Sequence, residues 1–293
     1  YPSCRGQEAV GVGMGSALQA TDVFCPYYRD QGCLIARGHP LSEILLAWGG
    51  DERGNNYSTP QAQEDFPNCV PIGTQLLHAT GIAYAIKYRE QSRAVLTACG
   101  DGGTSQGDFY EALNVAGQWQ LPVVFIVNNN QWAISIPRSE QTNTQTLAQK
   151  AIAAGIPGHQ VDGNDVIAMH YAVDEALKKA RNGGGPTLIE AITYRLSDHT
   201  TADDASRYQP SEEVKSAWKE EPIKRLAYFL ESKNLWSSEQ ETALQNELQA
   251  TLQTAINQYL ETPTPKATDM FDHLYAELPK DVATQRESLG DAS

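Results

Sequence analysis

The stretch that decides the fold is AVLTACGDGG, residues 94–103, in which an apolar run ends in a carboxylate and two glycines. Residues 94–99 have the length and β-branched content of a buried strand, and residues 123–127 repeat that pattern after Pro122. Between them, residues 108–119 show helical spacing, with Phe109, Leu113 and Ala116 on one face. The stretch therefore predicts two parallel strands joined by a helix, the repeating unit of an α/β sheet.

Polar side chains follow both predicted strands at the point where each strand ends. Asp101 follows the first strand, and Asn128-Asn129-Asn130 closes the second. The carboxyl ends of parallel strands meet at one edge of a sheet, and ligands of α/β proteins bind at that edge. A carboxylate and an amide oxygen favour magnesium or calcium over zinc. Because two oxygens do not complete a magnesium shell, phosphate oxygens, water and backbone carbonyls are expected to supply the rest.

The glycines after Asp101 extend this interpretation. Gly102 and Gly103 lack Cβ atoms, so their backbone N–H groups are able to approach a phosphate closely. Either motif alone is also typical of an ordinary turn. Together, each at the end of a strand, they favour a magnesium-bound diphosphate.

At this point the sequence resembles a known family. Gly100-Asp101-Gly102 with the closing Asn129-Asn130 is similar to the thiamine diphosphate motif. The segments GDGGTSQGDFYEALNVAG and AGIPGHQVDGND resemble the α subunit of the decarboxylating component of 2-oxo acid dehydrogenases, nearest to the bacterial pyruvate type. The resemblance extends from Gly6-Gln7-Glu8-Ala9 to the C-terminal helices. It implies the thiamine diphosphate-binding fold, with thiamine diphosphate and Mg²⁺ as cofactors.

The resemblance also implies roles for individual residues. Asp101, the Asn130 side chain and the Trp132 backbone carbonyl would hold magnesium, while Gly102 and Gly103 would line the diphosphate. A guanidinium binds phosphate bidentately, which suits an arginine next to the cofactor. The other implied cofactor contacts are Tyr28, Arg29, Val70, Ile72 and His199.

His199 is also the implied catalytic residue, as a contact or proton donor during acyl transfer. An imidazole suits that task because its ordinary pKa is about 6.5. The loop that carries it follows the strand-like residues 187–192, which return it to the same edge of the sheet. In contrast, His39, His159, His170 and His273 lie in contexts typical of solvated histidines.

The implied activity is that of an acetyl-transferring pyruvate dehydrogenase, an oxidoreductase that decarboxylates a 2-oxo acid and passes the acyl group to a lipoyl domain of the acyltransferase. Branched-chain 2-oxo acids and acetoin are alternative substrates, and a non-catalytic scaffold paralogue is a further alternative. A dinucleotide site at Gly11, Gly13 and Gly15 is less well supported, because no strand precedes these glycines.

A partner chain is expected as well. Thiamine diphosphate chemistry needs a carboxylate on the pyrimidine ring, which single-chain relatives supply from a second α/β domain. The residues after position 195 show helical patterns and leave no room for a second sheet. The resemblance therefore implies a separate β subunit in an α₂β₂ assembly, with the apolar helices at the interface.

Composition limits the class of protein. A net charge of −14 over 293 residues argues against nucleic acid as a partner, and no apolar run approaches the roughly 18 residues that cross a membrane. The five cysteines form no C-x-x-C pair, which favours reduced thiols in a bacterial cytoplasm, or in the mitochondrial matrix for a eukaryotic protein. The chain begins at Tyr1 without a signal-peptide pattern and is expected to be shortened at its start.

The pattern along the chain divides it into two parts. Residues 1–210 alternate strands with helices, which predicts a parallel sheet with helices on both faces. Residues 211–293 form a helical C-terminal extension with a long helix over 238–260, begun by a capping box at Ser238. Leu244, Leu248 and Leu252 form a packing stripe on that helix. A short helix near 269–278 and a polar tail are expected to follow.

Overall fold

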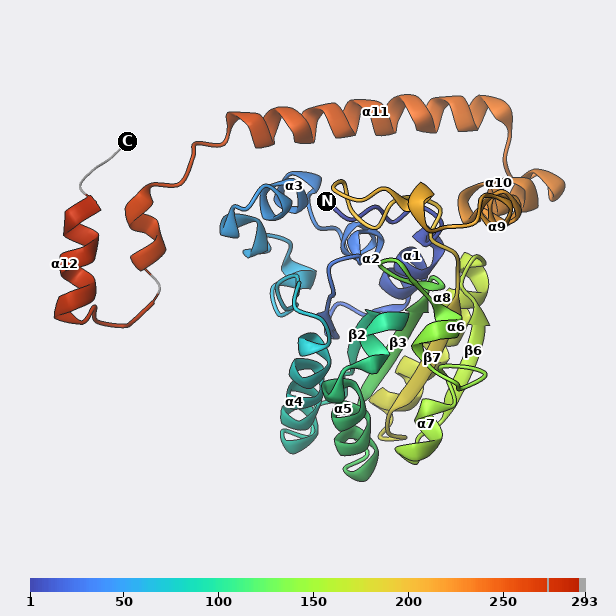
Figure 1. Ribbon diagram of the computed structural model, residues 1–293, viewed down its shortest axis with the longest axis horizontal. Coiled ribbons are helices and arrows are strands. Elements are labelled where there is room, and N and C mark those ends of the chain that lie inside the picture. The colour runs from blue at the N-terminus through green and yellow to red at the C-terminus, as the bar shows by residue number, and fades with distance from the viewer. Residues whose placement is uncertain (273, 290–293) are drawn as a thin grey trace.

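The computed structural model describes residues 1–272 and 274–289. A five-stranded parallel sheet in the order β1-β2-β3-β7-β6 forms the centre of the body, defined here as residues 1–210 (Figure 1). The strands are β1 (Val23–Cys25), β2 (Val95–Gly100), β3 (Val123–Asn129), β6 (Gly158–Asp162) and β7 (Thr187–Ile192). Helices separate consecutive strands, so the predicted α/β fold is confirmed.

Two groups of helices cover the two faces of the sheet (Figure 1). One face packs against α1 (Glu8–Ala17), α2 (Gln31–Ala36) and α8 (Val166–Arg181). The other packs against α4 (Thr74–Tyr88), α5 (Gly107–Gln118) and α7 (Lys150–Ala153). With both faces covered, β2 and β3 are buried almost throughout, which explains their nearly continuous apolar sequence.

Shorter elements connect this framework. They are α3 (Leu41–Trp48), the 3₁₀ turns η1 (Glu52–Asn55), η2 (Pro60–Ala62), η3 (Asp101–Ser105) and η4 (Ala205–Arg207), the two-stranded pair β4 (Trp132–Ala133) and β5 (Ile136–Pro137), and α6 (Arg138–Gln141). The helix α7 is only a single turn.

The C-terminal region is helical, as predicted. It contains α9 (Ser211–Ala217), η5 (Trp218–Glu220), α10 (Pro222–Ser232), α11 (Ser238–Glu261), η6 (Ala267–Phe271) and α12 (Lys280–Leu289). In Figure 1, α11 runs across the body near α3, while α12 stands apart from the body. The Tyr259 ring of α11 lies directly against Gly49, where a Cβ atom would be 2.5 Å from the phenol oxygen. This contact attaches the end of α11 to the body.

Two details of the C-terminal prediction were wrong. The N-cap of α11 is Ser237 rather than Ser238, and its side chain accepts a hydrogen bond from the backbone N–H of Gln240 at 3.3 Å. The segment expected to be a polar tail contains α12, whereas the preceding helix is only the 3₁₀ turn η6. Both segments are polar and weakly periodic, so sequence pattern places their ends poorly.

No helix in residues 1–272 and 274–289 is both long and apolar enough to cross a membrane. All five cysteines are free, and Cys99 is buried as a small core residue.

Candidate active site

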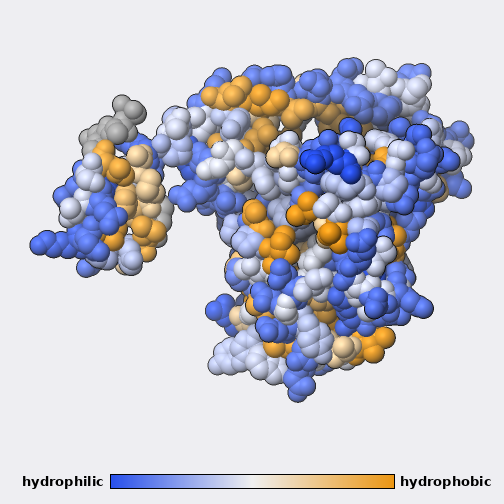
Figure 2. Space-filling view, viewed as in Figure 1, coloured by the Kyte–Doolittle hydropathy of each residue, from blue (hydrophilic) through white to orange (hydrophobic). Residues whose placement is uncertain are grey.

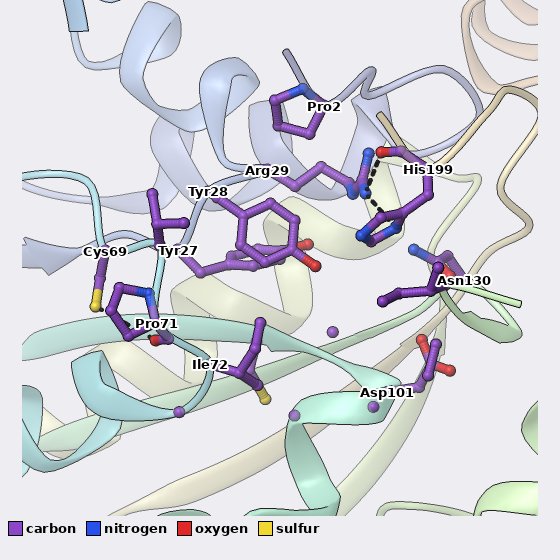
Figure 3. Close-up of a pocket in the computed structure, with 18 of the residues that line it drawn as sticks. Pro2, Tyr27, Tyr28, Arg29, Cys69, Pro71, Ile72, Asp101, Asn130 and His199 are labelled. Atoms are coloured by element: carbon purple, nitrogen blue, oxygen red, sulfur yellow. Dashed lines mark hydrogen bonds between the residues drawn. The ribbon is translucent and has the colours of Figure 1, made fainter. Parts of the chain in front are cut away.

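A cavity of about 400 Å³ opens at the carboxyl edge of the sheet (Figure 3). Its walls come from the segments that follow β1, β2, β3 and β7, together with the turn that precedes α4. All ten residues that the sequence indicated line it: Tyr28, Arg29, Val70, Ile72, Asp101, Gly102, Gly103, Asn130, Trp132 and His199. The fold therefore brings together side chains that lie up to 171 positions apart between Tyr28 and His199, in one space large enough for a small ligand.

Asp101 lies at the end of β2, where the strand turns into η3. Asp101 is only 1% exposed, and the Gln141 side-chain amide donates a hydrogen bond to its Oδ2 at 2.6 Å. Burial raises the pKa of Asp101, while the donors from Gln141 and from the backbone N–H of Asn130 partly oppose that rise. Gly100 of β2 pairs with Asn128 of β3, so the ends of the two strands meet, as the sequence predicted.

Asn130 follows β3 and is 4% exposed. Its Oδ1 accepts a hydrogen bond from the backbone N–H of Trp132 at 3.1 Å. Gln131 between them has a φ of 72°, in the left-handed region. This tight turn brings Trp132 back beside Asn130, so that an amide oxygen and a backbone carbonyl belong to the same small loop. Figure 3 shows Asp101 and Asn130 next to each other at one end of the cavity.

Gly102 has a structural reason to lack a side chain. A Cβ atom there would lie 2.6 Å from the Cβ of Ala133, so β4 packs directly on the turn after Asp101. At Gly103 the nearest atom to such a Cβ would be the Cβ of Cys99, at 3.1 Å. The two glycines thus allow close backbone packing around the Asp101 turn, in addition to any role toward a ligand.

Arg29 and His199 form one wall of the cavity, called the cationic wall here because of the Arg29 guanidinium. An Arg29 Nη2 group donates to the His199 backbone oxygen at 3.0 Å and lies 3.2 Å from the ring Nδ1 (Figure 3). Arg195 approaches the same Nδ1 at 3.4 Å. A guanidinium only donates, so Nδ1 is the acceptor and the ring proton resides on Nε2. Burial, with the charges of Arg29 and Arg195, lowers the pKa of His199 to about 4.

The remaining wall is apolar. Val70 and Ile72 are 57% and 45% exposed, which is unusual for such side chains inside a cavity wall. Gly73, with a φ of 89°, turns the chain from this segment into α4. The Tyr28 ring lies edge-on to the His199 ring, with centroids 6.1 Å apart. The cavity therefore has an oxygen-rich end, a cationic side and an apolar side.

The oxygen-rich end fits a divalent cation. Asp101 is a buried carboxylate that forms no ion pair with any side chain among the residues that the structure describes. Those residues also contain no group of three or more His, Cys, Asp or Glu side chains suited to a metal. A cation at this position would therefore rely on one carboxylate completed by amide and backbone oxygens, the donor set that hard ions accept.

Sequence reasoning missed three residues that contact the site. Gln141 holds Asp101, Gln7 contacts Asn130, and Arg195 contributes charge beside His199. No local pattern distinguishes these side chains from solvated ones, since each reaches the site only through the tertiary fold.

The expectation that His39 is solvated was wrong. His39 is 4% exposed, and the centroid of its ring lies 4.0 Å from that of Tyr57. His159 and His170 are exposed, and His273 lies outside the described residues.

Comparisons with known proteins agree with this geometry. Residues 1–268 match the family described as "Dehydrogenase E1 component". The 3-methyl-2-oxobutanoate dehydrogenase subunit alpha of Mycobacterium tuberculosis is 44% identical over 292 residues, 99% of this chain and 78% of the relative. The pyruvate dehydrogenase E1 component subunit alpha of Staphylococcus aureus is 41% identical over 288 residues, 98% of this chain and 77% of the relative. The chain therefore belongs to the dehydrogenase E1 component family and corresponds to its α subunits.

Proposed function

We propose that this chain is the α subunit of a thiamine diphosphate- and magnesium-dependent 2-oxo acid dehydrogenase. The assembly decarboxylates its substrate oxidatively and transfers the acyl group to a lipoyl domain. The observation that carries this proposal is the single cavity that contains all ten expected residues, in a chain of the E1 family. When bound, thiamine diphosphate supplies the carbanion chemistry, and the protein positions and activates it.

The oxygen-rich end of the cavity is assigned to the metal and the diphosphate. Asp101, the Asn130 side chain and the Trp132 carbonyl would hold Mg²⁺, and Gly102 and Gly103 would line the diphosphate. Support comes from the buried Asp101 carboxylate without an ion pair and from the close approach of Asn130 and Trp132. A divalent cation would neutralise this carboxylate, which otherwise resists ionisation in a buried setting.

The other two walls are assigned to the organic parts of the cofactor. Arg29 would bind phosphate oxygens, and its position beside Tyr28 fits the Tyr-Arg pair of the family. Val70 and Ile72 would contact the aminopyrimidine, which explains why apolar side chains stay exposed in an otherwise well-packed body. His199 is neutral near pH 7, so its Nε2–H would donate a hydrogen bond or a proton during acyl transfer.

The proposal includes partner chains. The described residues form one five-stranded parallel sheet and one small two-stranded pair, so they offer no second α/β domain to activate the pyrimidine ring. A β subunit in an α₂β₂ assembly would supply that carboxylate, and a lipoyl domain of the acyltransferase would receive the acyl group. We propose a cytoplasmic location in a bacterium, consistent with the five free cysteines.

Pyruvate is the proposed substrate, in line with the Staphylococcus aureus relative. A branched-chain acid is the second candidate, favoured by the Mycobacterium tuberculosis relative, whose printed name specifies 3-methyl-2-oxobutanoate. The test is carbon dioxide release from each acid by the chain combined with a β subunit, thiamine diphosphate and Mg²⁺. A higher kcat/KM for pyruvate supports the first assignment, and the reverse order supports the second.

Release from neither acid would leave acetoin cleavage or a non-catalytic scaffold. Calorimetry with thiamine diphosphate and Mg²⁺ in the presence of β subunit separates these outcomes. Saturable binding keeps the enzyme interpretation and directs the assay to acetoin. Absence of binding contradicts the proposed function.

A further inference from the structure

Gln7 contacts the proposed metal ligand Asn130 from the buried side of the cavity wall. It is the N-cap residue of α1 and is 2% exposed, yet its side chain makes no capping hydrogen bond. Its Oε1 instead accepts hydrogen bonds from the Nδ2 of Asn130 at 2.9 Å and from the Nδ2 of Asn128 at 3.1 Å. The Gln7 side chain therefore hydrogen-bonds to two asparagine amides and does not cap the helix.

The direction of the hydrogen bond to Asn130 follows from a donor whose identity is fixed. The backbone N–H of Trp132 only donates, so the Asn130 atom facing it is the oxygen and the opposite atom is Nδ2. The Gln7 atom that faces this Nδ2 is therefore an acceptor. The Thr193 hydroxyl lies 2.9 Å from the Asn128 oxygen, and because a hydroxyl both donates and accepts it fits this arrangement without fixing it.

We propose that Gln7 is a positioning residue that prevents the Asn130 amide from rotating and keeps its oxygen available to a divalent cation. This inference rests on the proposed function. A rotated amide would present its NH₂ group to the cation and repel it. Trp132 N–H holds one end of the amide and Gln7 holds the other, so both ends are fixed before a cation arrives.

The two ends of the Gln7 amide differ in what they contact. Its Nε2 is buried and has no hydrogen-bond partner among the described residues, whereas its Oε1 is the acceptor for the buried Nδ2 of Asn130. An unpaired buried donor lowers stability, so the Gln7 side chain is oriented by its acceptor oxygen and not by its own donors. What glutamine offers at this position is the acceptor oxygen shared by the two asparagines.

The test compares variants that differ in this acceptor. Gln7→Met keeps the length of the side chain and removes the carbonyl oxygen, whereas Gln7→Glu keeps an oxygen at the same place. Gln31→Met is the matched control, because Gln31 is 4% exposed and hydrogen-bonded to the Tyr28 backbone oxygen, but contacts neither Asp101 nor Asn130. Mn²⁺ serves as a paramagnetic probe, titrated with excess thiamine diphosphate into the assembly with β subunit.

Loss of an outer partner of a metal ligand weakens affinity by about 10–100-fold, so Gln7→Met is expected to raise the Kd of Mn²⁺ at least about tenfold. Gln7→Glu and Gln31→Met are expected to stay within about threefold of the unmodified chain. Thermal unfolding without metal checks that each variant is folded. If Gln7→Met fails to fold, the smaller Gln7→Ala removes the same acceptor without crowding and replaces it.

The inference is overturned if Gln7→Met binds Mn²⁺ as tightly as the unmodified chain. It is also overturned if Gln7→Glu or Gln31→Met loses as much affinity as Gln7→Met, because the loss would then follow packing and not the acceptor. An unmodified assembly that binds no Mn²⁺ would contradict the proposed function as well. The two failures are therefore distinguishable.

Discussion

The carboxyl edge of the sheet and the middle of α11 both reverse the usual distribution of side chains. At the sheet edge, Asp101, Asn130 and Arg29 are at most 4% exposed although they are polar. On α11, Leu248 and Leu252 are 51% and 42% exposed although they are apolar, and Figure 2 shows hydrophobic surface along this helix. Burying polar groups and exposing apolar ones both cost free energy. Both reversals agree with the proposed function, in which the sheet edge binds a charged ligand and the helix faces another protein surface.

The largest expected effect is a loss of ligand affinity at the sheet edge. Asp101 is the only carboxylate among the described residues that line the cavity, so in Asp101→Ala the affinity for thiamine diphosphate with Mg²⁺ should fall more than about a thousandfold, or about 4 kcal/mol. Calorimetry on the assembly with β subunit measures this loss. Asp101 forms no ion pair among the described residues, so its removal leaves no buried cation unpaired. The thermal unfolding temperature of the unliganded chain should therefore not fall.

Asp174→Ala is the control for that variant, because Asp174 forms an ion pair with Lys178 on the surface of α8, away from the residues that line the cavity. It should bind the cofactor like the unmodified chain. Tight residual binding by Asp101→Ala would remove Asp101 from the proposed metal site.

A second prediction contrasts two leucines of equal size. Leu113 of α5 is fully buried in the body, and Leu113→Ala should lower the free energy of unfolding of the isolated chain by about 2–5 kcal/mol. Leu248→Ala should change it by less than about 0.5 kcal/mol, because half of that side chain already faces solvent. Urea unfolding measures both. A large effect of Leu248→Ala on the isolated chain would show that α11 packs on the body and needs no partner.

The third prediction separates binding from chemistry at the cationic wall. His199→Ala should slow acyl transfer to a lipoyl domain about a hundredfold, the range lost when a positioned proton donor is removed. The affinity for thiamine diphosphate should change much less, because Arg29, the proposed phosphate contact, remains. Rapid-mixing measurement of lipoyl acylation beside calorimetry gives both quantities. Equal losses in the two would contradict the proposed role of His199.

The smallest expected effect is a pH dependence of stability. The folded-state pKa of His199 is about 4, below its ordinary value near 6.5, so between these values the unfolded chain binds the proton more readily. The contribution of this histidine is therefore complete above about pH 6.5 and is lost as the pH falls toward 4. His199→Asn should make the free energy of unfolding less steep across that window. An unchanged slope would indicate that the ring is solvated.

The sequence predicted an element well where the tertiary fold leaves a clear local pattern in it. Strands β2 and β3 were predicted almost to the residue because both are buried on two faces and read as continuous apolar runs. The short edge strand β6 was not predicted, because its residues are mostly exposed and polar. Among site residues, those at strand ends were predictable, since the end of a parallel strand fixes their place. Gln7 and Gln141 reach the site from a helix N-terminus and a distant loop, which no local pattern encodes.

The hydrogen bond between Arg29 and the His199 backbone joins residues 170 positions apart, and it carries a consequence for synthesis of the protein. A growing chain that has emerged only to residue 190 already contains Asp101 and Asn130, but it contains β7 only in part and lacks the loop that positions His199. Its cationic wall would consist of Arg29 alone. In the proposed function, thiamine diphosphate should therefore bind late, after translation has passed this loop, to a chain whose sheet is already complete.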